Sequence, residues 1–226
     1  MTVLHLADEG EAADLAAFLS RLLHYDRGAA VRLQAAGTAL AVFGRPPSFE
    51  VLAIRATRLA KPYENGLDAS LDATVSAGEL LESVDERAAT ALLPAVVTGP
   101  PWTGVLPPRG GWQPEPGLPA PDELRATVAA AVSEFRSRTD GLGPERRTRA
   151  ELDGIGREIW SRPIGNTGLP VRAVHAAQSL GFLRPTAGPD DTPALFASGA
   201  WLRLRTPYGS VAVRRAGLAT LSVSVR

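Results

Sequence analysis

Residues 201–215 read Trp-Leu-Arg-Leu-Arg-Thr-Pro-Tyr-Gly-Ser-Val-Ala-Val-Arg-Arg, a pattern that predicts the fold class of the C-terminal half. Leucine alternates with arginine over 201–205, and a second extended run covers 210–215. A period of two places neighbouring side chains on opposite faces of a β-strand, and the intervening Thr-Pro-Tyr-Gly consists of turn residues. The stretch therefore predicts a β-hairpin, and the alternation of Leu, Ser and Val over 221–225 predicts a third strand.

The N-terminal half carries a hairpin of its own. Residues 38–43 and 49–59 read as strands, and the segment 44–48 between them contains two prolines, which remove ladder donors and indicate a turn. Before this hairpin, apolar residues at helical spacing predict a helix over 9–23 that is capped by Asp8. A second helix is predicted from Asp26 to Ala36.

Capping signals and apolar spacing predict further helices. Ser83-Val84-Asp85-Glu86 has the pattern of a capping box, so a helix is expected from there to just before Pro94. Three more helices are expected at about 122–139, 149–161 and 170–180, ahead of the C-terminal hairpin.

A proline-rich segment separates the two halves. Residues 94–121 contain nine prolines and five glycines, too many for regular structure. Trp102 and Trp112 lie within it, and buried indoles contribute a large apolar area, so we expect the segment to be strapped onto a surface. A polyproline stretch that a partner protein reads is the alternative.

Together these elements predict an α+β fold in which helices pack with short antiparallel hairpins in both halves. We expect an N-terminal helix–hairpin half over 1–93, a strap over 94–121 and a C-terminal half over 122–226. One integrated domain is the alternative, because tryptophans that pin the strap weaken the case for independent units.

Composition excludes several chemistries. The chain has no cysteine, which excludes disulfides, thiolate nucleophiles and sulfur-ligated metals, and indicates a reducing, cytoplasmic compartment. We find no signal peptide and no stretch near the ~18 apolar residues of a spanning helix, so no membrane association is expected. Only Lys61 is a lysine among 24 basic residues, a bias typical of GC-rich genomes.

Charge is distributed unevenly although the net charge is zero. Residues 1–100 carry 8 basic and 13 acidic side chains, whereas residues 101–226 carry 16 basic and 11 acidic ones. Such asymmetry is typical of proteins that bind an anion or a nucleic acid. It is equally compatible with the acidic half meeting the basic half of the same molecule or of a second copy.

Five motifs in the sequence resemble those of one protein family. They are 107–112 (Pro-Pro-Arg-Gly-Gly-Trp), 158–163 (Glu-Ile-Trp-Ser-Arg-Pro), 168–170 (Gly-Leu-Pro), 175–183 (His-Ala-Ala-Gln-Ser-Leu-Gly-Phe-Leu) and 201–209. Together they are similar to a family of uncharacterised cytoplasmic proteins of high-GC actinobacteria. The resemblance implies an origin and no activity or site residue.

The order of three helices and a basic hairpin is also that of a winged helix-turn-helix. In this interpretation the third helix enters the major groove of DNA and the hairpin arginines neutralise phosphates. The candidate nucleic-acid or anion-binding residues are Arg172, His175, Gln178, Arg203, Arg205 and Arg214. The long link between the second and third helices, 161–169, argues against this interpretation.

Aromatic and basic residues on the C-terminal hairpin suggest an interface instead. Trp201, Arg203 and Arg205 share one face of their strand, and tryptophan and arginine are enriched in protein–protein contacts. The candidate interface residues are Trp201, Arg203 and Tyr208.

Readable enzyme motifs are absent. There is no P-loop, GxGxxG or GxSxG pattern, and the three histidines are too scattered to form a helical metal pair. A general base within 24–27 and an anion-binding loop at 165–168 are conceivable, but a helix corner and an ordinary turn explain the same residues. No metal and no cofactor are expected.

The sequence thus favours a non-catalytic binding or regulatory protein that self-associates as a homo-oligomer or binds a protein partner. The alternatives are a winged-helix-like nucleic-acid-binding regulator and an enzyme whose site is assembled from sequence-distant residues.

Overall fold

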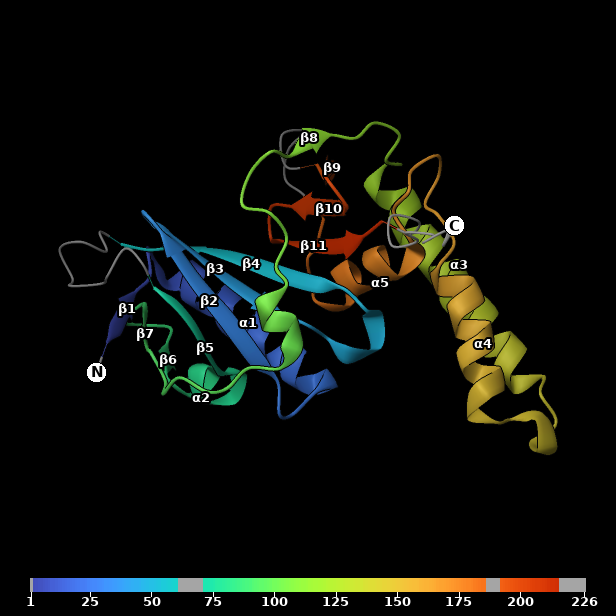
Figure 1. Cartoon of the computed structure of the whole chain (residues 1–226), viewed down its shortest axis with the longest axis horizontal. Helices are drawn as coiled ribbons and strands as arrows, with labels where there is room; N and C mark the ends of the chain where they lie inside the picture. The colour runs from blue at the N-terminus through green and yellow to red at the C-terminus, as the bar shows by residue number, and fades with distance from the viewer. Residues whose placement is uncertain (1, 61–70, 186–191, 216–226) are drawn as a thin grey trace, which may run out of the picture.

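The computed structural model describes residues 2–60, 71–185 and 192–215, and it shows an α+β fold built on a large antiparallel sheet (Figure 1). The sheet has eight strands in the order β5-β2-β3-β4-β11-β10-β9-β8. In that order they are β5 (Asp72–Ser76), β2 (Ala30–Ala36), β3 (Ala39–Gly44), β4 (Leu52–Arg58), β11 (Gly209–Arg214), β10 (Trp201–Thr206), β9 (Ala194–Ser198) and β8 (Gln113–Pro114). A smaller sheet contains β1 (Val3–His5), β7 (Thr90–Leu92) and β6 (Val84–Asp85).

Five α-helices and three 3₁₀ turns complete the described part of the chain. The helices are α1 (Glu9–Tyr25), α2 (Ala77–Glu82), α3 (Pro121–Asp140), α4 (Arg149–Trp160) and α5 (Val171–Ser179). The turns are η1 (Pro47–Phe49), η2 (Pro101–Gly104) and η3 (Pro144–Arg146). None of these helices is long and apolar enough to cross a membrane, a finding that covers only the described residues.

The two predicted hairpins lie side by side in the large sheet. Strand β4 of the N-terminal hairpin pairs with β11 of the C-terminal hairpin, in the register Ile54 with Ser210 and Leu52 with Ala212. Backbone hydrogen bonds therefore run without interruption from β5 to β8 across both halves of the chain. The exact boundaries between the predicted halves stay a prediction.

The sheet has two unlike faces. On β10, Leu202 and Leu204 point into the main hydrophobic core, where α1 packs on β4 and α5 packs on β11. On the opposite face a smaller apolar cluster is covered by the proline-rich segment, with η2 in front of the sheet (Figure 1). This covered face is called the strap face below.

The proline-rich segment is a strap, as predicted. Trp102 packs on the small cluster, and the backbone oxygen of Thr103 accepts a 3.0 Å hydrogen bond from Arg32 Nη1. Further along, the hydroxyl of Ser198 donates to the backbone oxygen of Gly110, and β8 pairs with β9. The strap therefore closes one edge of the sheet and covers part of one face.

Helices α3 and α4 form a hairpin that extends away from the sheet, here called the helical arm (Figure 1). Side-chain ion pairs hold its two helices together. Arg138 donates to both carboxylate oxygens of Glu158 at 2.8 Å, and Arg162 donates to Glu158 and Glu134. The arm joins the body through contacts of both helices with α5.

Most predicted elements are confirmed. Helix α1 begins after Asp8, whose carboxylate accepts from the Glu11 amide, and α4 begins after Thr148, whose hydroxyl accepts from the Glu151 amide. Both hairpins and the three helices before the second hairpin are present. The predicted strand at 221–225 lies outside the described residues.

The helix predicted from Asp26 to Ala36 is wrong. Residues 30–36 form strand β2, whose burial alternates with a period of two and which pairs with both β3 and β5. Asp26 ends α1, and Gly37 uses its positive φ of 59° in the turn from β2 to β3. Pairing on both edges overrides the short-range helix signals.

The helix predicted after Ser83 is also wrong. Ser83 is the C-cap of α2, and its hydroxyl donates to the backbone oxygens of Leu80 and Leu92. The residues that follow form β6, a turn and β7, so the apparent capping box ends a helix. Pairing of β7 with β1 stabilises the extended form.

Candidate anion-binding pocket

A cavity of about 380 Å³ opens on the strap face at one end of the sheet, and it is called the Trp–Arg pocket below. Five segments meet there: the β3–β4 connection, η2 of the strap, the first turn of α5, the start of β10 and the end of β11. The lining residues are Arg45, Glu50, Val51, Leu52, Pro101, Trp102, Val105, Arg172, Trp201, Ala212, Val213 and Arg214.

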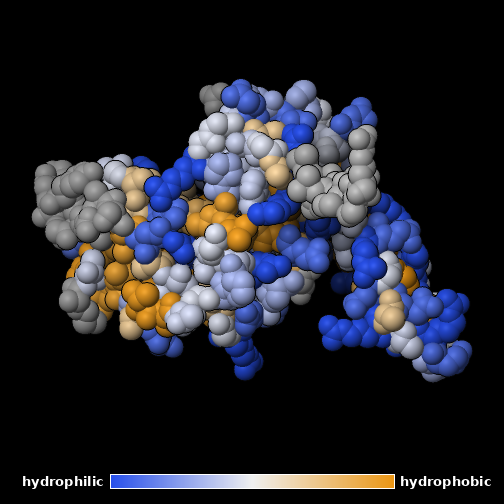
Figure 2. All heavy atoms as spheres, viewed as in Figure 1, coloured by the Kyte–Doolittle hydropathy of each residue, from blue (hydrophilic) through white to orange (hydrophobic). Residues whose placement is uncertain are grey.

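The floor and one wall of the pocket are apolar. Trp102 and Trp201 both pack against a buried cluster from the strands β3, β4 and β11. The members of that cluster are Phe43, Leu52, Ile54 and Ala212. Figure 2 shows apolar side chains gathered over β4 and β11 in the centre of this face, with hydrophilic side chains around them.

The pairing of β10 with β11 fixes the position of Arg214 in the pocket. Trp201 and Arg214 are direct cross-strand partners in β10 and β11, so their side chains lie on the same face. The Arg214 guanidinium carbon lies 5.2 Å from the centre of the Trp201 ring, a cation–π contact. The hairpin thus presents a cation directly beside an aromatic wall.

The pocket carries more positive than negative charge. Three arginines line it against one carboxylate, Glu50, whose side chain is 74% exposed. The side chains of Arg45 and Arg214 form neither a hydrogen bond nor an ion pair with any residue in the described part of the chain. Both arginines are exposed, so an anion that enters the pocket can reach their guanidinium groups, and a cluster of like charges attracts an anion.

Arg172 is only weakly paired. Its Nη1 donates to the hydroxyl of Ser161 at 3.2 Å, and its Nε lies 4.0 Å from the carboxylate of Glu50. The Nε atom is buried and has no hydrogen-bond partner among the described residues. A buried donor without a partner costs free energy unless a ligand satisfies it.

Glu50 holds a left-handed backbone conformation with φ of 52°. Residues other than glycine rarely adopt this conformation, and strain of this kind concentrates at functional sites. Ala89, with φ of 50°, is the only other such residue in the described ranges, and it does not line the pocket. The strain at Glu50 is therefore located at the pocket rim.

The structure brings three of the predicted residues together in this pocket: Arg172, Trp201 and Arg214. Two others, His175 and Gln178, line a separate cavity of about 540 Å³ between α3 and α5. The His175 ring stacks on Trp160 at 4.8 Å and meets the edge of Phe49 at 5.1 Å. Burial lowers the pKa of His175, so its imidazole is neutral near pH 7. Its two ring contacts connect α4 of the arm with η1 of the body.

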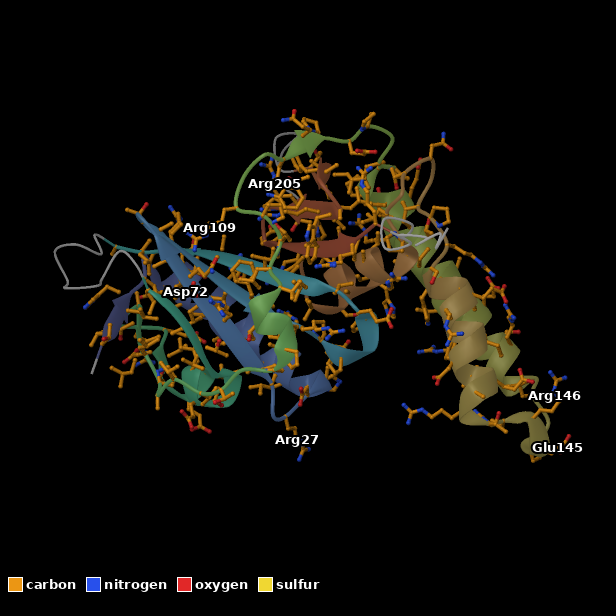
Figure 3. All side chains as sticks on the ribbon, in the orientation of Figure 1. Arg27, Asp72, Arg109, Glu145, Arg146 and Arg205 are labelled. Carbon is orange, nitrogen blue, oxygen red and sulfur yellow. The ribbon has the colours of Figure 1, made fainter. Side chains whose placement is uncertain are left out.

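The remaining predicted residues make contacts within the chain. Arg203 donates to the Ser210 hydroxyl at 3.0 Å and lies over the Trp112 ring. Its pKa is lowered mainly by burial and also by the positive charge of the neighbouring Arg205. Arg205 lies over the ring of Phe196. Figure 3 shows Arg205 and Arg109 on the face that the strap crosses.

Tyr208 is occupied by intramolecular contacts. Its backbone oxygen accepts from Arg55 Nη1 at 2.8 Å, and the guanidinium of Arg184 lies over its ring at 4.6 Å. One face of its ring is therefore occupied within the chain, and its predicted role in an interface stays a prediction.

The winged-helix interpretation gains no support from this geometry. The hairpin that would form the wing is paired on both edges, with β4 and with β9. Five of the nine residues of α5, the candidate recognition helix, are buried. A recognition helix needs an exposed face long enough to enter the major groove.

Sequence reasoning missed Arg45, Glu50 and the position of Trp102 in the pocket lining. These residues lie more than a hundred positions before Arg214, and only the pairing of β4 with β11 brings them to the same end of the sheet. The run 44–48 carried a turn signal, but no local pattern indicates which side chain a turn presents to a distant strand.

No group of three or more histidine, cysteine, aspartate or glutamate side chains suited to a metal ion occurs among the described residues. The polar and aromatic groups that line the Trp–Arg pocket are three guanidiniums, two indoles and one carboxylate.

Comparisons with known proteins divide the chain at the strap. Residues 1–104 match a family described as domain of unknown function DUF8010, and residues 107–218 match domain of unknown function DUF8185. The Trp–Arg pocket takes residues from both matched regions, so it lies at their junction. The predicted actinobacterial origin stays a prediction.

Two curated proteins are similar to part of the chain. They are the 3-oxoadipyl-CoA/3-oxo-5,6-dehydrosuberyl-CoA thiolase of Escherichia coli strain K12 and a beta-ketoadipyl-CoA thiolase of Escherichia coli. Each is 34% identical over 89 residues, which covers 39% of this chain and 21% of the thiolase. The chain thus matches about a fifth of the length of these relatives, and no solved structure matches it significantly.

Proposed function

We propose that this protein is a binding protein for a small organic anion, which it holds in the Trp–Arg pocket. The observation that carries the proposal is the meeting of three arginines and two tryptophans, contributed by five separate segments, around one cavity. Ligand sites are typically concave, largely apolar and marked by a few converging polar groups, and they often lie where two units of a chain meet.

A binding role is favoured over catalysis by the residues that line the pocket. All of them belong to the described part of the chain, and none is Ser, Thr, Cys, His, Lys, Tyr or Asp. Nucleophilic or general acid–base catalysis needs such a group within reach of the substrate. Glu50 is the one carboxylate, and it is mostly exposed.

Binding of anions to the purified protein tests the proposal. We expect isothermal titration calorimetry at low ionic strength to show saturable binding of phenyl phosphate or citrate. The Arg214→Gln variant should weaken binding about tenfold or more, because one charge-assisted contact is lost. Coenzyme A should be titrated as well, because the names of the two similar thiolases mention CoA compounds. We do not propose thiolase activity for this protein.

Arg27→Gln is the matched control for this experiment. Arg27 is exposed and lies far from the pocket (Figure 3). Its replacement by glutamine removes one positive charge, as the replacement of Arg214 does. The control should bind as the wild type does. Equal binding by the wild type and Arg214→Gln, or no binding of any anion, would refute the proposal.

Self-association, a cytoplasmic location and a regulatory role remain proposals that rest on the sequence. The opposite charges of the two halves do meet within one chain, since Arg184 pairs with Asp14 at 3.1 Å. That contact reduces the need for a second copy to neutralise them.

A further inference from the structure

We propose that the anion bound in the Trp–Arg pocket is a phosphate monoester carried close to a planar aromatic ring, as in a nucleoside monophosphate. This inference rests on the proposed function and specifies its ligand. Three properties of the pocket lead to it: its charge, the position of its cations relative to its aromatic wall, and its size.

The charge of the pocket fits a dianion. Three guanidinium groups face one carboxylate, which leaves two positive charges without a partner in the lining. A phosphate monoester carries a charge of about −1.5 to −2 at neutral pH. Guanidinium groups bind phosphate and carboxylate oxygens alike through paired, parallel donors, so it is the two uncompensated charges that favour a phosphate dianion over a simple monocarboxylate.

The placement of the cations restricts the shape of the ligand. Arg214 lies directly over the Trp201 ring, and Trp102 lines the same cavity from the strap. A ligand whose ring stacks on the indole wall therefore has its charged group within a short reach of the ring. A nucleoside monophosphate has this arrangement, since one ribose separates base and phosphate, whereas a fatty acid has its charge at the end of a long chain.

The volume of the cavity restricts the size of the ligand. At about 380 Å³ it lies near the lower end of the range of small-molecule pockets, roughly 300–1,000 Å³. Such a volume suits a single nucleotide. A nucleic-acid strand, which needs a continuous groove of several nucleotides, does not fit the same pocket.

The pocket also links the two regions that match separate families. Arg45, Glu50 and Trp102 come from the first region, and Arg172, Trp201 and Arg214 come from the second. A ligand that touches the three arginines and both indoles bridges the junction. Ligand binding should therefore raise the melting temperature of the full chain, because it favours only the joined, folded state.

Calorimetric titration of the full chain with matched ligands tests the inference. The probes are the monophosphates of adenosine, guanosine, cytidine and uridine, pyridoxal 5′-phosphate, ribose 5-phosphate and adenosine. At least one ring phosphate should bind about tenfold or more tightly than ribose 5-phosphate, which lacks the ring, and adenosine, which lacks the phosphate. Comparing the affinities for the nucleotides with the affinity for pyridoxal 5′-phosphate shows which of these two kinds of ring phosphate the pocket prefers.

Variants at the aromatic wall supply the second half of the test. Trp102→Leu should bring the affinities for the ring phosphates and for ribose 5-phosphate close together, and Trp102→Phe should restore much of the preference for the ring. Trp112→Leu, on the same strap but outside the pocket lining, is the control.

The possible failures are distinguishable. If ribose 5-phosphate binds as tightly as every ring phosphate, the ring part of the inference is overturned and the proposed function survives. If adenosine binds as tightly as its monophosphate, the phosphate part is overturned. If none of these ligands, nor phenyl phosphate nor citrate, binds, the inference and the proposed function both fall.

Discussion

At the scale of single residues, the rim of the pocket contains a strained backbone at Glu50 and a buried Arg172 nitrogen without a hydrogen-bond partner among the described residues. Glu50 keeps a left-handed conformation directly after η1. Its carboxylate lies 4.0 Å from a buried Arg172 nitrogen that has no hydrogen bond within the described chain. A residue placed only for stability would be expected to avoid this conformation. Both features lie at the rim of the pocket that we propose as the ligand site.

Glu50→Gly should therefore stabilise the protein and tighten anion binding. Glycine adopts the positive φ without strain, so the free energy of unfolding should rise by about 1 kcal/mol. Loss of the carboxylate also removes the one negative charge in the lining. Chemical denaturation and calorimetry measure the two effects.

Ala89→Gly is the control, because Ala89 has nearly the same φ outside the pocket. It should show a similar gain in stability and an unchanged affinity for anions. A Glu50→Gly variant that binds anions less tightly than the wild type would contradict the assigned position of Glu50.

At the scale of elements, exposed ion pairs join the two helices of the arm in addition to their apolar contacts. Glu158 is shared between Arg138 and Arg162, and Arg162 also binds Glu134. Hydrogen bonds from Arg138 and then Arg162 lower the pKa of Glu158 to about 2. The contribution of Glu158 to stability is therefore complete above the ordinary carboxyl pKa of about 4.5 and is lost as the pH falls toward 2.

Glu158→Gln should consequently lower the melting temperature at pH 7 and make little difference at pH 2. Thermal unfolding followed by circular dichroism across this range measures the effect. Glu145→Gln, at the exposed tip of the arm, should follow the wild type at every pH (Figure 3). An equal loss at pH 2 and pH 7 would show that the charge network does not support the arm.

The elements also show what the sequence can predict. Helix α1, the two hairpins and the helices from α3 to α5 follow from caps and from apolar periodicity, both of which are local signals. Strand β2 was mistaken for a helix because Asp26 and Gly37 resemble caps, while its partners in β3 and β5 come later in the chain. The pairing of β4 with β11, which builds the pocket, has no signal in either strand alone.

At the scale of the whole molecule, buried charge joins the two halves near the middle of the sheet. Arg55 on β4 is only 5% exposed and pairs with Glu11 at 3.0 Å and Asp14 at 3.2 Å on α1. It also donates to the backbone oxygen of Tyr208 in the turn from β10 to β11. One side chain therefore connects a helix and a strand of the N-terminal half with the C-terminal hairpin.

Arg55→Ala should destabilise the whole protein by about 3–5 kcal/mol, because it removes the buried cation of the cluster and leaves Glu11 with only the exposed Arg58 as a partner. Arg58→Ala is the matched control: Arg58 pairs with the same Glu11, but its side chain is 70% exposed. Its replacement should cost much less. Denaturant unfolding of both variants decides whether the buried cluster is structural, and similar losses in both would contradict this account.

The central claim is that the two halves meet to form an anion pocket walled by Trp102 and Trp201. The most direct test follows the four tryptophan indole N–H signals by nuclear magnetic resonance while a nucleoside monophosphate is added. The account predicts that the signals of Trp102 and Trp201 shift saturably, whereas that of Trp160 in the arm stays in place. A saturating titration that moves neither of the two pocket signals would contradict it.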